Sequence, residues 1–198
     1  MIGDLYKKIV PLLLVINVCI LCNTLDDQNY IFPDFIPYQE SKTSIGINIY
    51  NNLDKIQESF LLNNWFTNNL YVNGSISSLK TFNEIALRYN ASIGYAYNMD
   101  YKLAKNMIFM LGYNRSRFEN NESDNINMSY NLLFNMKLKS FWISLSYGII
   151  NDDSQIQNFS INFVSSIFDS FILTFGVKNI FNNQDNLITP SLSLRYKI

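Results

Sequence analysis

The sequence contains no histidine, only two cysteines and little charge, and each shortage excludes a class of function. Without histidine there is no imidazole to activate a nucleophile, to bind a metal ion or to titrate near neutral pH. The two cysteines, Cys19 and Cys22, both lie near the N-terminus. A mature chain that is cut after Thr24 therefore has no cysteine and no disulfide.

Charged residues make up 16% of the 198 residues, the net charge is −1 and the mean hydropathy is −0.00. This hydropathy is too low for a helical membrane protein, while the charge is sparse for a soluble one. Barrel strands with one face toward lipid and one toward a polar interior give this mixture. No block of basic residues stands out, so we expect no nucleic acid partner.

The segment Asn83–Asn98 has the clearest pattern in the chain. From Ile85 to Tyr97 every odd position is apolar, and the even positions are polar or small. Side chains of a β-strand alternate between two faces, so the segment predicts one strand with an apolar and a polar face. At roughly 3.3 Å per residue it covers about 40 Å, and a tilt near 45° lets it cross a hydrocarbon core of about 30 Å.

The same alternation recurs from Ser44 to the C-terminus and predicts about ten strands, an even number as closed bacterial barrels require. The stretch Ile56–Thr67 is the least regular and also suits a short helix, so eight or twelve strands are alternatives. Closure satisfies every backbone polar group in lipid. We therefore predict an all-β fold, a closed antiparallel transmembrane β-barrel over residues 44–198. Its strands are expected near Ser44, Ile56, Leu70, Ile85, Met107, Ile126, Phe141, Phe159, Phe171 and Ile188.

The connections agree with periplasmic chain ends. Short inner turns are expected at Asn68–Asn69, Lys139–Ser140 and Phe168–Ser170, with a longer one at Met99–Lys105. Longer polar outer loops are expected at Arg117–Asn125 and Asn151–Gln155, among others.

Residues 1–24 resemble a secretory signal peptide. Lys7 and Lys8 precede an apolar run, Ile9–Leu21, that is short for a transmembrane helix. Two alternatives are an uncleaved anchor helix and lipidation at Cys22. Residues 25–43 are predicted to form an irregular periplasmic lead-in, a mobile tail rather than a small plug inside the barrel.

The C-terminal segment Ser191–Ile198 alternates to the last residue, with Tyr196 two places before the end. It resembles the final strand of bacterial outer-membrane β-barrel proteins, although Ile198 stands where phenylalanine is usual. The resemblance implies recognition by the barrel-assembly machinery. The segment Phe175–Asn182 is similar to the penultimate strand of TonB-dependent receptors. The chain is far too short for such a transporter, so the resemblance is to small porin-like barrels in general.

The inward positions are predicted to be mostly asparagine, serine, glycine and threonine, with few charges. The candidate lumen charges are Glu84, Arg88, Lys137, Lys178 and Arg195. Rings of charge create selectivity constrictions in channels. The alternative, which we favour, is that these residues form ion pairs that brace the interior. Trp142, Leu133, Met110 and Ile172 also point inward by register, which argues against a wide pore.

Aromatic residues near the predicted strand ends are candidates for the girdles at the lipid–water boundary. They are Tyr50, Tyr71, Tyr97, Tyr113, Phe141, Tyr147, Phe171 and Tyr196. The acids Glu119, Glu122, Asp124, Asp152 and Asp153 gather in two loops, but their spacing does not fit an EF-hand. We expect solvated loops, and no metal or cofactor.

These features predict a non-enzymatic protein of the bacterial outer membrane. One hypothesis is a structural, adhesive or assembly component that does not conduct. The alternative is a narrow passive channel for small polar solutes or ions. Expected partners are the lipid bilayer with its lipopolysaccharide and the barrel-assembly machinery, and the sequence does not indicate an oligomeric state.

Overall fold

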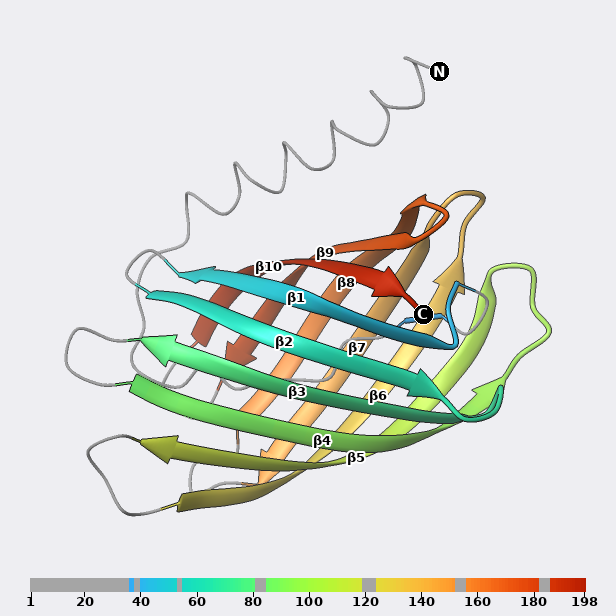
Figure 1. The fold of residues 1–198 in the computed structure, drawn as a ribbon. Helices are drawn as coiled ribbons and strands as arrows, with labels where there is room; N and C mark the ends of the chain where they lie inside the picture. The colour runs from blue at the N-terminus through green and yellow to red at the C-terminus, as the bar shows by residue number, and fades with distance from the viewer. Residues whose placement is uncertain are drawn as a thin grey trace.

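A computed structural model of the chain describes residues 36–37, 40–52, 55–80, 85–118, 124–151, 156–181 and 186–198 (Figure 1). The predicted signal peptide and Cys22 lie outside the described residues. The described part holds ten strands: β1 (Thr43–Asn52), β2 (Lys55–Trp65), β3 (Leu70–Lys80), β4 (Ile85–Asn98), β5 (Ala104–Phe118), β6 (Asp124–Lys137), β7 (Trp142–Asn151), β8 (Ile156–Phe168), β9 (Phe171–Phe181) and β10 (Asn186–Lys197).

The ten strands form one closed barrel in which each strand pairs antiparallel with its neighbours in sequence. The barrel closes where β1 pairs with β10, from Ser44 opposite Lys197 to Tyr50 opposite Ser191. The predicted all-β closed barrel of ten strands is therefore confirmed, and the uncertain second segment is a strand, not a helix. In the part of the chain that the structure describes, no helix is long and apolar enough to cross a membrane.

Four short turns join the strands at the end of the barrel where β1 begins and β10 ends (Figure 1). They comprise residues 66–69, 99–103, 138–141 and 169–170. We call this end the terminal end and the opposite end, where the other connections lie, the loop end. The predicted short turns therefore share one end of the barrel with the start of β1 and the end of β10.

The two faces of the wall differ as the alternation predicts. Every strand exposes large apolar side chains on the outside, for example Ile47, Phe60, Ile76, Ile93, Phe109, Tyr130, Tyr147, Phe159, Phe171 and Leu192. The inside carries small polar side chains, which are buried: Asn48, Ser59, Asn73, Asn90, Ser92, Ser129, Asn131, Asn135, Ser144, Ser146, Ser160, Asn162, Thr174, Ser191 and Ser193.

Asparagine pairs link neighbouring strands across the inner face. Asn90 Nδ2 donates to Asn114 Oδ1 at 2.7 Å, and Asn135 Nδ2 donates to Asn106 Oδ1 at 2.7 Å. Glycine leaves room for larger neighbours, since a Cβ on Gly46 would lie 2.6 Å from Cγ of Arg195. The inner face is therefore a polar surface whose side chains are hydrogen-bonded and closely packed.

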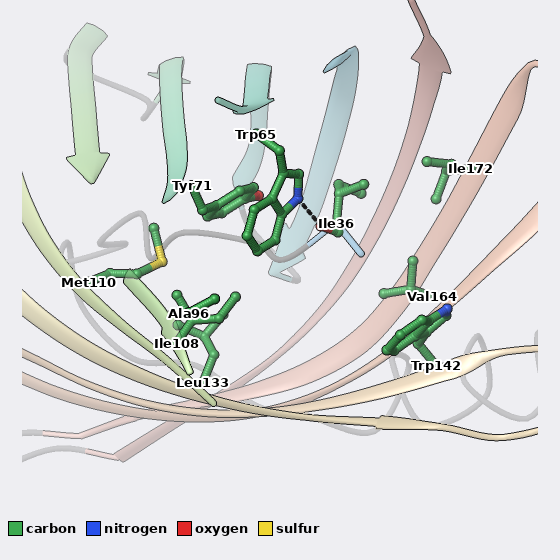
Figure 2. Close-up of a cluster of buried hydrophobic side chains, with 10 residues drawn as sticks. All are labelled: Ile36, Trp65, Tyr71, Ala96, Ile108, Met110, Leu133, Trp142, Val164 and Ile172. Carbon is green, nitrogen blue, oxygen red and sulfur yellow. Dashed lines mark hydrogen bonds between the residues drawn. The ribbon is translucent and has the colours of Figure 1, made fainter. Parts of the chain in front are cut away.

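An apolar layer crosses the interior near the terminal end (Figure 2). Its wall residues lie opposite one another on neighbouring strands, such as Trp65 with Tyr71, Ala96 with Ile108 and Trp142 with Val164, while Leu133 lies opposite Ile108. Met110 and Ile172 complete the wall part, and Ile36 contributes from outside the strands. The predicted inward placement of Trp142, Leu133, Met110 and Ile172 is confirmed.

Candidate functional site

The described residues just before β1 lie at the terminal end of the barrel. We call these residues, Ile36, Pro37, Glu40, Ser41 and Lys42, the plug segment. Ile36 is 1% exposed and belongs to the apolar layer. The backbone turns there, because the Pro37 carbonyl accepts the amides of Glu40 at 3.0 Å and Ser41 at 3.2 Å. These described residues are buried or hydrogen-bonded to the barrel wall, unlike the mobile tail that was expected, and the lead-in over residues 25–43 as a whole stays a prediction.

Both tryptophans of the sequence hold the plug segment. Trp65 Nε1 donates to the Ile36 carbonyl at 2.8 Å, and Trp142 Nε1 donates to Glu40 Oε1 at 3.1 Å. Figure 2 shows Ile36 between Trp65 on one side of the lumen and Trp142 on the other. Trp65 and Trp142 are 3% and 1% exposed, so each buried indole donor is satisfied by the segment that it contacts.

The Glu40 carboxylate joins the plug segment to three wall strands. Besides Trp142 of β7, its oxygens contact Ser166 Oγ of β8, and Lys197 Nζ of β10 lies 4.0 Å away. Lys197 Nζ also donates to Ser166 Oγ at 2.8 Å. The side chains of Glu40 and Lys197 are only 21% and 19% exposed. Water and salt therefore screen the attraction between them less than they would screen a fully exposed ion pair. We call Glu40, Trp142, Ser166 and Lys197 the latch.

The predicted lumen charges do not gather at one level. Arg88, Lys178 and Arg195 are buried on the inner face, as their register predicts. Arg195 lies near the terminal end of β10, whereas Arg88 and Lys178 lie toward the loop end of β4 and β9. Lys137 Nζ lies 5.2 Å from the centre of the Trp142 ring, beside the apolar layer. Glu84 lies outside the described residues.

Of the side chains that the structure describes, Glu40 is the one acid that reaches the barrel interior, where it lies 4.0 Å from the Lys197 ammonium. Sequence reasoning missed it, because it lies before the first strand and carries no periodic signal. The inward direction of Trp142 was predictable, but its partner is 102 residues away in the chain.

Most candidate girdle residues lie on the outer face. Tyr97, Tyr113, Tyr147, Phe171 and Tyr196 are exposed there. The side chain of Tyr50 lies outside the described set.

Tyr71 corrects the girdle prediction. It is 0% exposed and points inward, with its ring centre 4.7 Å from that of Trp65 and its hydroxyl donating to Asn63 Oδ1 at 2.6 Å. Leu70, Val72 and Ile76 form the apolar outward row of β3, so the alternation puts Tyr71 on the inner face and the girdle assignment is wrong.

No group of three or more potential metal ligands occurs among the described residues. The acidic loop residues Glu119, Glu122, Asp152 and Asp153 lie outside them, as does the side chain of Asp124.

Comparison with known proteins identifies the fold and not a family. No family model and no curated protein matches the chain. Among solved structures, a KdgM porin in complex with disordered oligogalacturonate superposes with a TM-score of 0.50 and 11% identity, over 78% of this chain and 99% of that one. A second KdgM porin structure gives 0.50 and 8% over the same shares. The chain therefore shares a porin-like barrel fold.

Proposed function

We propose that this protein is an integral β-barrel of the outer membrane of a Gram-negative bacterium. The terminal end faces the periplasm, and the loop end faces the outside, next to lipopolysaccharide. The barrel-assembly machinery reads the C-terminal strand. The proposal assigns no catalytic activity to the chain, because the sequence offers no histidine to activate a nucleophile.

The outer surface of the barrel supports the membrane placement. Each strand presents exposed large apolar side chains, so the apolar surface continues around the barrel. Soluble monomers rarely expose contiguous apolar patches larger than a few hundred Å². The strands are 10 to 15 residues long, and a transmembrane strand needs about 9–11 residues.

The layer at the terminal end favours a barrel that does not conduct. The ten side chains of this layer, from Ile36 of the plug segment to Ile172 of β9, are all buried. We infer a structural, adhesive or assembly component whose contact surfaces are the loop end and the periplasmic end. The buried apolar layer is the observation on which this role depends.

A narrow passive channel is the second candidate. The fold shared with a porin favours it, as does the polar inner wall between the apolar layer and a second buried apolar cluster at the loop end, Ile150, Ile156 and Ile180. Inward cations outnumber the one described inward acid, so such a channel would favour anions.

Two measurements test the proposal. The refolded protein should require detergent or lipid, show β circular dichroism and migrate differently on gels before and after heating. A protein that stays soluble without detergent would contradict the membrane placement. In planar bilayers the full-length protein should be silent after insertion. Steady open currents from every inserted barrel would instead identify the channel.

A further inference from the structure

We propose that two adjoining turns at the terminal end form a binding site for the headgroup of an anionic phospholipid. The turns comprise residues 99–105, from the end of β4 into β5, and residues 137–141, from the end of β6 to β7 (Figure 1). We call them the basic turn pair. The inference rests on the membrane placement proposed above and adds a lipid class to it. Because the terminal end faces the periplasm in that placement, the ligand is a phospholipid of the periplasmic leaflet.

Positive charge from the turns of the terminal end is concentrated in the basic turn pair. The pair holds one acid, Asp100, and four lysines, which gives it a net charge of +3. The other two turns at this end, residues 66–69 and 169–170, hold no lysine, and their one charged residue is Asp169. An anionic ligand is therefore attracted to one side of this barrel end, near β4 to β7.

Backbone hydrogen bonds close the first turn and join it to the second. The Met99 amide donates to the Lys105 carbonyl at 2.8 Å, and the Lys137 amide donates to the Leu103 carbonyl at 2.9 Å. The lysines are thus carried on one hydrogen-bonded backbone surface and not on two separate loops.

Two of the four lysines make contacts within the protein. Lys105 lies at a β-bulge of β5, and its Nζ donates to the Tyr101 carbonyl at 2.8 Å. Lys137 Nζ lies 5.2 Å from the centre of the Trp142 ring. These contacts fix the shape of the turns. The two lysines that we assign to the ligand are exposed, Lys102 and Lys139.

The surroundings of Lys102 indicate a lipid boundary. Its neighbours in sequence, Tyr101 and Leu103, are 68% and 50% exposed, and Tyr97, which points outward near the end of β4, is 64% exposed. Aromatic side chains favour the lipid–water boundary, where a lysine keeps its stem on apolar surface and its ammonium among the headgroups. A soluble acidic partner is the less favoured ligand, because it offers no hydrocarbon to these exposed apolar side chains.

The chemistry of lysine suits a lipid phosphate. Each ammonium group carries three donors and binds phosphate oxygens as a point charge. Phosphatidylglycerol has a net negative charge, whereas the choline group of phosphatidylcholine offsets the charge of its phosphate. The site should therefore prefer phosphatidylglycerol to phosphatidylcholine, although both lipids contain a phosphate diester.

Energy transfer from tryptophan to labelled lipid tests the site, since both tryptophans of the sequence belong to the apolar layer near the terminal end. The full-length protein is refolded into phosphatidylcholine vesicles. These contain a small fraction of phosphatidylglycerol or phosphatidylcholine with the same pyrene label on an acyl chain. The wild type should bind phosphatidylglycerol at least about fivefold more tightly than phosphatidylcholine, and added salt should weaken this preference.

Substitutions of the exposed lysines locate the site. Lys102→Gln/Lys139→Gln should abolish the preference, and Lys102→Arg/Lys139→Arg, which keeps both charges, should retain it. Lys42→Gln is the matched control, because Lys42 is an exposed lysine of the same barrel end. It directly precedes β1, which lies across the ring of ten strands from β6, so its removal should leave the preference in place.

Each outcome decides the inference. A preference that survives in Lys102→Gln/Lys139→Gln, or that falls equally in Lys42→Gln, would overturn the site. A wild type without any preference would also overturn it and would favour a soluble acidic partner for the lysines. If the double variant does not fold, Lys139→Gln alone is compared with Lys42→Gln, and equal preferences would overturn the site. Absence of transfer to either labelled lipid would instead contradict the membrane placement.

Discussion

Replacing Tyr130 by arginine distinguishes a membrane barrel from a soluble one. Tyr130 lies near the middle of the 14-residue β6, points outward and is 48% exposed. Its neighbours across the ladders are Leu111 and Ile149, which are also apolar. Arginine at this site is therefore surrounded by hydrocarbon in a bilayer but by water in a soluble protein. The loss of folding free energy caused by Tyr130→Arg should differ between the two cases.

The expected magnitudes are well separated. An arginine on the lipid face near the bilayer midplane costs about 2–4 kcal/mol of folding free energy. A surface substitution on a soluble protein usually changes it by less than about 0.5 kcal/mol. Tyr97→Arg is the control, since Tyr97 also points outward but lies next to the terminal end of β4. There the cost of arginine should fall to about 0–1 kcal/mol.

The assay is reversible denaturant unfolding in lipid vesicles, followed by tryptophan fluorescence and by heat-dependent gel migration. Folding and unfolding curves must coincide before a free energy is derived from them. Equal costs for Tyr130→Arg and Tyr97→Arg, both within about 0.5 kcal/mol of the wild type, would refute the lipid-facing assignment of the outer surface.

Two further predictions concern the inner face. Gly46→Ala should destabilise the barrel by about 1–3 kcal/mol, because the added Cβ would lie 2.3 Å from the Leu194 carbonyl oxygen of the paired strand. The control is Gly74→Ala on the outer face of β3, where the Cβ would find its nearest atom at 3.8 Å, and it should stay within about 0.5 kcal/mol. Equal denaturant midpoints for the two variants would contradict the close packing at Gly46. Tyr71→Phe should cost about 1 kcal/mol by removing the buried hydrogen bond to Asn63, and an unchanged midpoint would place the hydroxyl in water.

The latch illustrates what a single sequence does not reveal. Glu40 precedes every strand, so no periodicity assigns it to a face. Its partners Trp142 and Ser166 are 102 and 126 residues away. They meet it only because closure of the barrel brings β7, β8 and β10 around one end.

Tyr71 illustrates a different source of error in the prediction from sequence. Its position near a strand end is visible in the sequence, but an aromatic side chain suits both a girdle and a buried layer. The alternation of β3 already indicates the inner face for Tyr71, because Leu70, Val72 and Ile76 form the apolar outward row, and the pairing of Tyr71 with Trp65 on the inner face of β2 agrees.

By itself the sequence determined that the chain forms about ten two-faced strands and which side of most strands is apolar. Alternation with a period of two is a local property, and it needs no knowledge of distant residues. The tertiary structure decided the burial of the plug segment, the partners of Glu40 and the fit of Arg195 beside Gly46. These depend on closure of β1 against β10, which sets residues from opposite ends of the chain side by side in one lumen.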